Sequence, residues 1–157
     1  MKIELWAIGK TNEKYLEAGI EIFEKRLKNY LPFAFQILPD VKQKTSDGAQ
    51  LKKKEAEMVL SKLGQDDFLV LLDEQGREYT SVELAQWLER RLSNIPRKMV
   101  FLIGGAFGFA PEIYARANEK LALSKLTFSH QMGRLFFLEQ LYRAMTILKN
   151  EPYHNGS

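Results

Sequence analysis

Two side chains that can carry positive charge, His130 and Arg134, stand one helical turn apart near the C-terminal end of the chain. Residues four apart lie on the same face of a helix, so both would point to one place. Cations at a helix N-terminus oppose the helix dipole, and a phosphate-bearing substrate would compensate for them. A lone histidine is more often a hydrogen-bonded structural residue, but the pair favours a functional role.

Three apolar runs in the second half of the chain end in turns that could hold a ligand. They cover residues 67–73, 99–103 and 121–128, and the turns after them are Glu74-Gln-Gly76, Gly104-Gly-Ala-Phe-Gly108 and Ser129-His130. Ligands of open α/β sheets bind beyond the carboxyl ends of the strands. If the runs are neighbouring parallel strands, their turns converge on one pocket.

The second and third of these regions each allow two interpretations. The glycine-rich turn 104–108 is either a ligand cradle or a plain strand-to-helix turn, and it lacks the G-x-G-x-x-G spacing of a dinucleotide site. Polar Ser124, Lys125 and Thr127 interrupt the run 121–128. Because buried polar groups need partners, this run either leaves the sheet early to wrap a ligand or forms an edge strand with one wet face.

Strand and helix patterns alternate along the whole chain, which indicates an α/β fold. The expected strands cover residues 2–8, 33–38, 68–72, 99–103 and 121–128. The expected helices cover 13–31, 51–63, a stretch opened by the capping box Thr80-Ser-Val-Glu83, a short stretch from Pro111, and about 133–149. This order predicts a mainly parallel sheet with helices on both faces. No repeat or change of composition divides residues 1–157, so we expect one domain.

Composition restricts the possible functions. The 157 residues include no cysteine and two histidines, so thiol chemistry is excluded and we expect no protein-held metal. No apolar run is long enough to span a membrane, and no signal-peptide pattern is present, which fits the cytoplasm. The net charge of +3 permits an anionic partner. The basic cluster Lys52-Lys53-Lys54, with Lys42 and Lys44 before it, is interpreted as a solvated helix face, because Glu55 and Glu57 follow it.

Taken together, several motifs closely resemble one family, the small SPOUT-class methyltransferases that modify N3 of a pseudouridine in bacterial large-subunit ribosomal RNA. The motifs are Leu71-Leu-Asp-Glu-Gln-Gly76, Phe101-Leu-Ile-Gly-Gly-Ala-Phe-Gly108, Leu123-Ser-Lys-Leu-Thr-Phe-Ser-His130, Arg134, Glu139-Gln-Leu-Tyr-Arg143 and Pro152-Tyr-His154. The resemblance covers essentially the whole chain. One position departs from the family pattern, since Ser129 stands where the family has proline.

The resemblance implies a C-terminal trefoil knot, with a knotted cofactor-binding part at about 67–157. It implies a homodimer that acts on RNA in the assembled ribosome, with each active site completed by the partner's C-terminal tail. S-adenosylmethionine would lie against the following residues: Leu72, Gly104, Leu123, Ser124, Lys125, Leu126, Thr127 and Phe128.

The chemistry of methyl transfer assigns roles to the remaining candidates. The weakly acidic N3 proton must leave before or during attack, so we expect His154 or His130 to assist its removal. Arg134 would contact RNA phosphate or the ionising base, and Tyr153 would stack on or orient the nucleotide. Arg143 is a further candidate for substrate binding. Two alternatives stay open, a nucleotide-dependent oxidoreductase on the same architecture and a non-catalytic ribosome- or RNA-binding module that uses the face between Lys42 and Lys54.

Overall fold

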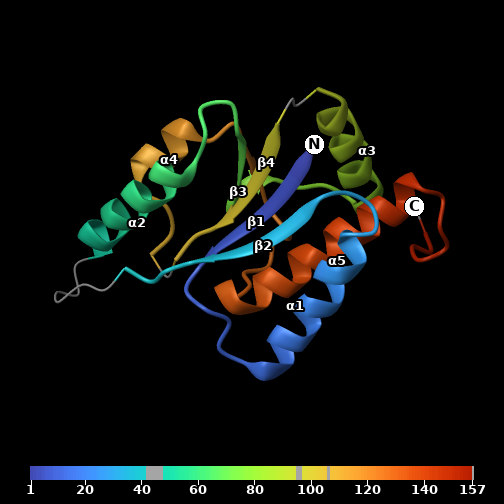
Figure 1. The fold of residues 1–157 in the computed structure, drawn as a ribbon, viewed down its shortest axis with the longest axis horizontal. Helices are drawn as coiled ribbons and strands as arrows, with labels where there is room; N and C mark the ends of the chain where they lie inside the picture. The colour runs from blue at the N-terminus through green and yellow to red at the C-terminus, as the bar shows by residue number, and fades with distance from the viewer. Residues whose placement is uncertain (42–47, 95–96, 106, 157) are drawn as a thin grey trace.

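The structure, a computed structural model, describes residues 1–41, 48–94, 97–105 and 107–156. Its elements, in chain order, are β1 (Lys2–Ile8), α1 (Lys14–Leu27), β2 (Phe33–Leu38), α2 (Gly48–Lys62), β3 (Phe68–Arg77), α3 (Ser81–Asn94), β4 (Lys98–Ile103), α4 (Pro111–Arg116), β5 (Glu119–Leu121) and α5 (His130–Leu148). The strands form one sheet in the order β2-β1-β4-β3-β5, and each pairing between neighbours is parallel (Figure 1).

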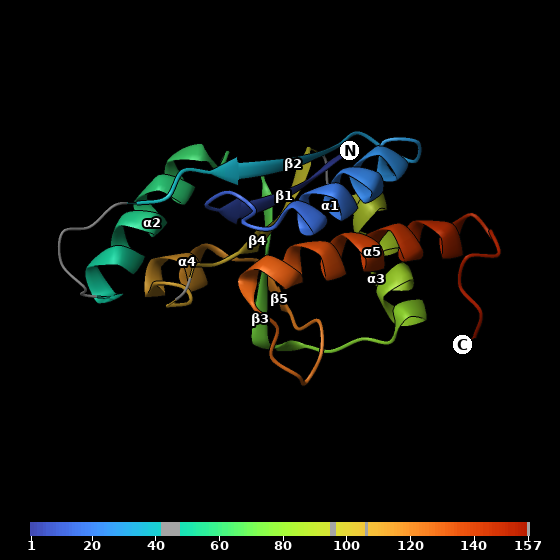
Figure 2. The ribbon, with the colours of Figure 1, turned by 90° about the horizontal axis from the view of Figure 1, so that it is seen from below.

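Helices cover both faces of this sheet, as the sequence predicted. On β1, Ile3, Leu5 and Ala7 belong to a core that also contains buried residues of α1, α3 and α5. Trp6, between them, belongs to a second core shared with α2 and α4. Figures 1 and 2 show the two helix layers on opposite sides of the strands. A parallel strand buried on both faces needs apolar residues throughout, which explains the apolar run Met99–Ile103 of β4.

The predicted start signals of two helices are confirmed. Thr80 and Glu83 form a capping box ahead of α3, since the Thr80 N–H donates to Glu83 Oε1 at 2.8 Å and the Glu83 N–H donates to Thr80 Oγ1 at 3.1 Å. Pro111 occupies the first turn of α4, where its missing N–H costs no helical hydrogen bond. These local contacts fix where α3 and α4 begin, and packing into different cores places the two helices on opposite faces of the sheet.

The predicted strand 121–128 is wrong. The strand β5 covers only Glu119–Leu121 at the sheet edge, and the chain then leaves the sheet. The predicted turn at residues 74–76 is also wrong, because β3 continues through an irregularity to Arg77. Gly76 permits this path, since a Cβ there would lie 2.6 Å from the backbone nitrogen of Leu121. The two segments therefore pass each other in direct backbone contact.

Two helix starts also differ from the sequence prediction. The helix α5 begins at His130 rather than near residue 133, and α2 begins at Gly48 rather than Leu51. Ser129 explains the first difference, because its Oγ accepts a hydrogen bond from the Met132 N–H at 3.1 Å and so caps α5. Across the described ranges, no helix combines the length and apolarity needed to cross a bilayer.

Candidate functional site

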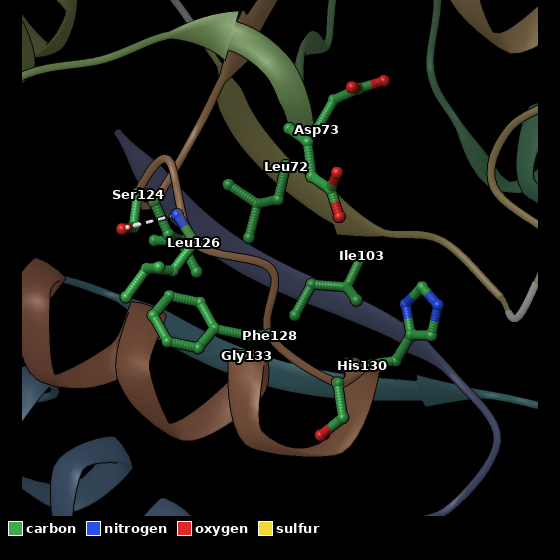
Figure 3. A pocket seen from close by; sticks show the side chains of 11 residues that line it. Leu72, Asp73, Ile103, Ser124, Leu126, Phe128, His130 and Gly133 are labelled. Carbon is green, nitrogen blue, oxygen red and sulfur yellow. Dashed lines mark hydrogen bonds between the residues drawn. The ribbon is translucent and has the colours of Figure 1, made fainter.

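A hollow opens beside the middle of β3 and at the carboxyl end of β4, and the carboxyl ends of parallel strands commonly bind ligands. We call it the main hollow, and Figure 3 shows its side chains. It is lined by Leu72, Asp73, Glu74, Ile103, Leu123, Ser124, Leu126, Phe128, Ser129, His130 and Gly133. The strand residues Leu72 to Glu74 and the third predicted turn, Ser129-His130, therefore meet here, whereas the second run contributes only its last strand residue, Ile103.

The loop that follows β5 bends around this hollow with most of its backbone unpaired. Within the described part of the chain, no backbone–backbone hydrogen bond involves residues 123–128. One N–H of the loop has a side-chain partner, since the Leu126 N–H donates to Ser124 Oγ at 3.0 Å. The remaining N–H and C=O groups are free to bind a ligand. This outcome favours the interpretation in which the polar run leaves the sheet early.

The walls of the main hollow are apolar and its rim is charged. The side chains of Leu72, Ile103 and Phe128 point into it (Figure 3). Asp73 stands at the rim, where its Oδ1 accepts from the Gln75 N–H at 2.8 Å and its Oδ2 accepts from the Tyr114 hydroxyl. Burial and this contact raise the pKa of Tyr114 to about 12, so its hydroxyl stays protonated and continues to donate. The hollow suits a flat apolar group with a polar edge.

His130 stands at the first residue of α5, on the wall of the main hollow. Partial desolvation lowers its pKa although the residue is exposed at the surface, the nearby Arg134 charge lowers it further, and Glu74 opposes this effect. The imidazole is therefore neutral near pH 7 and can accept a proton.

Arg134 is buried, with 1% of its surface exposed. Its guanidinium donates to the backbone oxygen of Ile8 at 2.9 Å and to Thr11 Oγ1 at 3.1 Å, while its buried Nε has no partner among the described residues.

A second hollow lies beside the main one and shares Ser129 and His130 with it. Its lining comes from the ends of β1 and β4, the segment after β2, helix α2 and the start of α5. The lining residues are Ile8, Asp40, Val41, Leu51, Glu55, Gly104, Gly105, Ser129, His130, Gln131 and Arg134. The glycine-rich turn thus faces this second hollow. His130 stands between the two spaces, so a group in each could approach the same imidazole.

The C-terminal tail folds back onto the other end of α5. The Tyr153 hydroxyl donates to Glu139 Oε2 at 3.1 Å, and Arg143 contacts both Glu139 at 2.8 Å and His154 Nδ1 at 3.0 Å. Because thirteen residues of helix rise by about 20 Å, His154 beside Arg143 is remote from His130. Figure 2 shows the C-terminus at the opposite end of α5 from the loop around the hollow.

The structure brings together some of the predicted residues and separates others. Six of them line the main hollow: Leu72, Leu123, Ser124, Leu126, Phe128 and His130. Gly104 borders the second hollow, and Lys125 and Thr127 are exposed outside the lining of both. Arg143, Tyr153 and His154 form a separate cluster at the tail.

Several residues that line the two hollows were not predicted from the sequence. Ile103 and Gly133 were missed at the main hollow, and Glu55 was assigned to a solvated helix face although it is buried. Helical spacing could have placed Glu55 inward, because Leu51 and Val59 lie four residues before and after it. Lys42 and Lys44 lie outside the described residues.

Comparison with known proteins assigns the chain to a family. A family model described as "Predicted SPOUT methyltransferase" matches residues 1–154. The chain belongs to the SPOUT methyltransferase family. It is 51% identical over 156 residues to the "Ribosomal RNA large subunit methyltransferase H" of Christiangramia forsetii, with 99% of each chain covered. The proteins of the same name from Parabacteroides distasonis and Cytophaga hutchinsonii are each 49% identical over 99% of this chain and cover 99% and 100% of their own lengths. The resemblance seen in the sequence is confirmed at the level of the family and the α/β fold.

Proposed function

We propose that this methyltransferase transfers a methyl group from S-adenosylmethionine to N3 of a pseudouridine in the large-subunit ribosomal RNA of the assembled ribosome. One observation carries the proposal: the unpaired backbone of residues 123–128 bends around an apolar hollow whose wall holds a neutral histidine. The names of the relatives support an RNA of the large subunit as the substrate. A ribosomal substrate also supports a cytoplasmic location.

The main hollow fits the chemical parts of S-adenosylmethionine. Leu72, Ile103 and Phe128 offer apolar walls for the adenine ring, and the free backbone groups of residues 123–128 can pair with its polar edge. Asp73 and Glu74 at the rim can accept hydrogen bonds from ribose hydroxyls or the ammonium group. When bound, the cofactor supplies an electrophilic methyl group on a sulfonium. The part of the chain that the structure describes contains no cluster of metal-ligating side chains.

The residues around His130 supply the proton chemistry that the reaction needs. The N3 proton is weakly acidic, so a neutral imidazole that accepts it assists the attack. The buried guanidinium of Arg134 lies beside the second hollow and stabilises the negative charge that develops on the base. His130 and Arg134 thus act on the same ring from one end of α5.

We further propose a homodimer in which the tail of each protomer serves the hollow of the other. His154 is remote from its own chain's His130, and its buried Nε2 has no partner among the described residues. Phe136 on α5 is 39% exposed, and its ring centroid lies 4.8 Å from that of Phe128, so a partner packed on Phe136 would lie beside the main hollow. In this arrangement Tyr153 stacks on the nucleotide, Arg143 contacts the substrate and His154 is a second candidate for proton removal.

The chain organisation is part of the same proposal. We propose that residues 1–157 form a single domain whose part from about 67 to 157 is a trefoil knot. The direct backbone passage of Gly76 against Leu121 supports a crossing at this point.

The test is methyl transfer from labelled S-adenosylmethionine to ribosomes from cells that lack this protein, followed by mass spectrometry of the RNA. We expect one methyl group on N3 of one pseudouridine. Salt-sensitive ribosome binding without transfer would support the non-catalytic module instead. Calorimetry that shows binding of a nicotinamide dinucleotide and not of S-adenosylmethionine would support the oxidoreductase.

Complementation between subunits tests the shared site. His130→Ala and His154→Ala protomers are co-expressed, so that a mixed dimer contains one hollow with an intact His130 and an intact partner tail. We expect the mixed dimer to methylate ribosomes although each variant alone does not. A tail that acts within its own chain would give no rescue.

A further inference from the structure

The second hollow contains a buried carboxyl that has no partner among the residues that the structure describes. Glu55 on α2 is 8% exposed, and among the described residues it has no hydrogen-bond or ion-pair partner. An unpaired polar group in such a place is destabilising unless water or a ligand in the hollow satisfies it. Burial, together with the negative charge of Asp40, raises the pKa of Glu55 and favours the neutral carboxyl.

The glycine-rich turn makes room for this carboxyl. A Cβ on Gly105 would lie 2.6 Å from Glu55 Oε2, so any larger residue at this position would displace the Glu55 side chain. The carboxyl therefore lies against the backbone at the end of β4, in the space that continues to His130. The unpartnered Nε of Arg134 belongs to a side chain that lines the same space. This hollow thus presents donors and acceptors to a polar ligand.

The position of the second hollow suits the methyl acceptor. The main hollow fits the methyl donor, and His130 and Ser129 line both spaces. A ring in the second hollow would therefore have one edge towards His130 and the donor, and a neighbouring edge towards Glu55. The group that meets Glu55 must pair with a carboxyl.

Pseudouridine carries the matching group on the correct side of its ring. Its sugar is attached through C5, so N1 keeps a hydrogen next to the C2 carbonyl, while N3 lies beyond that carbonyl. A neutral carboxyl accepts from N1–H through its carbonyl oxygen and donates its hydroxyl to the C2 carbonyl. In uridine, N1 bears the sugar, so this edge does not exist. Glu55 can thus distinguish the two bases without contacting N3.

We propose that the second hollow receives the target base and that Glu55 pairs with its N1–H, so that Glu55 determines the preference for pseudouridine over uridine. This inference rests on the proposed function. A site built to pair with a particular N–H discriminates strongly against an analogue that lacks it.

The experiment compares two ribosome preparations, one with pseudouridine at the target position and one with uridine from cells that lack the pseudouridine synthase. The kcat/KM for methyl transfer is measured on each, and its ratio reports selectivity. Glu55→Ala should lower the ratio by about tenfold or more. Glu55→Gln should retain it, because the amide also offers an N–H donor beside a carbonyl acceptor. Glu57→Ala, an exposed acid on the same helix, is the matched control and should leave it unchanged.

Calorimetry with S-adenosylmethionine shows that each variant is folded, since Glu55 does not line the main hollow. If the alanine variant does not fold, Glu55→Met, which keeps the side-chain length without a hydrogen-bonding group, replaces it. A wild-type protein that does not prefer pseudouridine would overturn the inference. So would an unchanged ratio in the alanine variant, or an equal loss on both substrates. Absence of methyl transfer by the wild-type protein to either ribosome would instead contradict the proposed function.

Discussion

Ser129 offers a quantitative test of how the site helix is held. Its Oγ accepts from the Met132 N–H at 3.1 Å, and its backbone has the extended geometry of an N-cap, with φ −62° and ψ 155°. Removing an N-cap hydrogen bond costs about 1 kcal/mol. For a protein of this size that loss corresponds to a Tm decrease of about 2–4 °C. We therefore expect Ser129→Ala to unfold at a lower temperature by this amount.

Proline at the same position should behave differently. The φ of −62° matches the value that a proline ring imposes, and among the described residues the Ser129 N–H has no hydrogen-bond partner. Restricting the unfolded chain contributes about 0.4–1 kcal/mol, which offsets most of the lost cap. Ser129→Pro should therefore keep its Tm within about 2 °C of the wild type. Ser129→Thr, which retains a capping hydroxyl, is the matched control.

Differential scanning calorimetry of the four proteins, with and without S-adenosylmethionine, measures these shifts. The reasoning is refuted if the proline variant unfolds at or below the temperature of the alanine variant, because the backbone at residue 129 would then not fit proline. An alanine variant with wild-type Tm would show that the Oγ contact does not stabilise α5. Either result would also change the explanation for where α5 begins.

Four further predictions concern the two hollows. Gly105→Ala should lower the Tm, because the new Cβ would lie 2.6 Å from the Glu55 carboxyl. Adding Glu55→Ala removes that carboxyl and should restore the Tm. A double variant as unstable as Gly105→Ala alone would contradict this clash. Burial raises the pKa of Glu55 above its ordinary 4.5. The folded state therefore binds the Glu55 proton more tightly than the unfolded state does. The free energy of unfolding contributed by this proton is lost as pH rises through the raised pKa. Glu55→Gln does not titrate and should therefore gain Tm relative to the wild type from pH 4.5 upward, whereas a pH-independent difference would argue against an unpaired carboxyl. Phe128→Ala should weaken S-adenosylmethionine binding by about tenfold in calorimetry through lost stacking, while Phe107→Ala, an exposed aromatic outside the main hollow, should not. Arg134→Leu leaves the Ile8 carbonyl and the Thr11 hydroxyl unpaired. It should lower the free energy of unfolding, measured in urea, by about 2 kcal/mol or more. A smaller loss would mean that water replaces the guanidinium.

Local sequence rules predicted most of the fold because they act within a few residues. The capping box at Thr80 and Glu83 and the proline at the start of α4 each depend on neighbouring backbone groups. The apolar run Met99–Ile103 predicted that β4 is buried on both faces. These patterns were sufficient for the order of the elements and for the two helix layers.

Features that depend on contacts between distant segments could not be predicted in the same way. The run 121–128 has strand-like composition, but only its first residue belongs to β5 and the rest bends around the main hollow. The turn expected at Gly76 is a strand because the missing side chain admits the backbone of Leu121. Glu55 is buried although charged residues surround it in sequence, since β4 and α5 close the second hollow over it.

Hydrogen exchange of the backbone amides with and without S-adenosylmethionine tests the central claim most directly. The unpaired amides of residues 123–128 should exchange rapidly in the free protein and become protected when the cofactor is added, together with those of Leu72 to Glu74. Helix α2, which lines only the neighbouring hollow, should change little. Saturating cofactor that leaves the exchange of residues 123–128 unchanged, or protects a different edge of the sheet, would contradict the account.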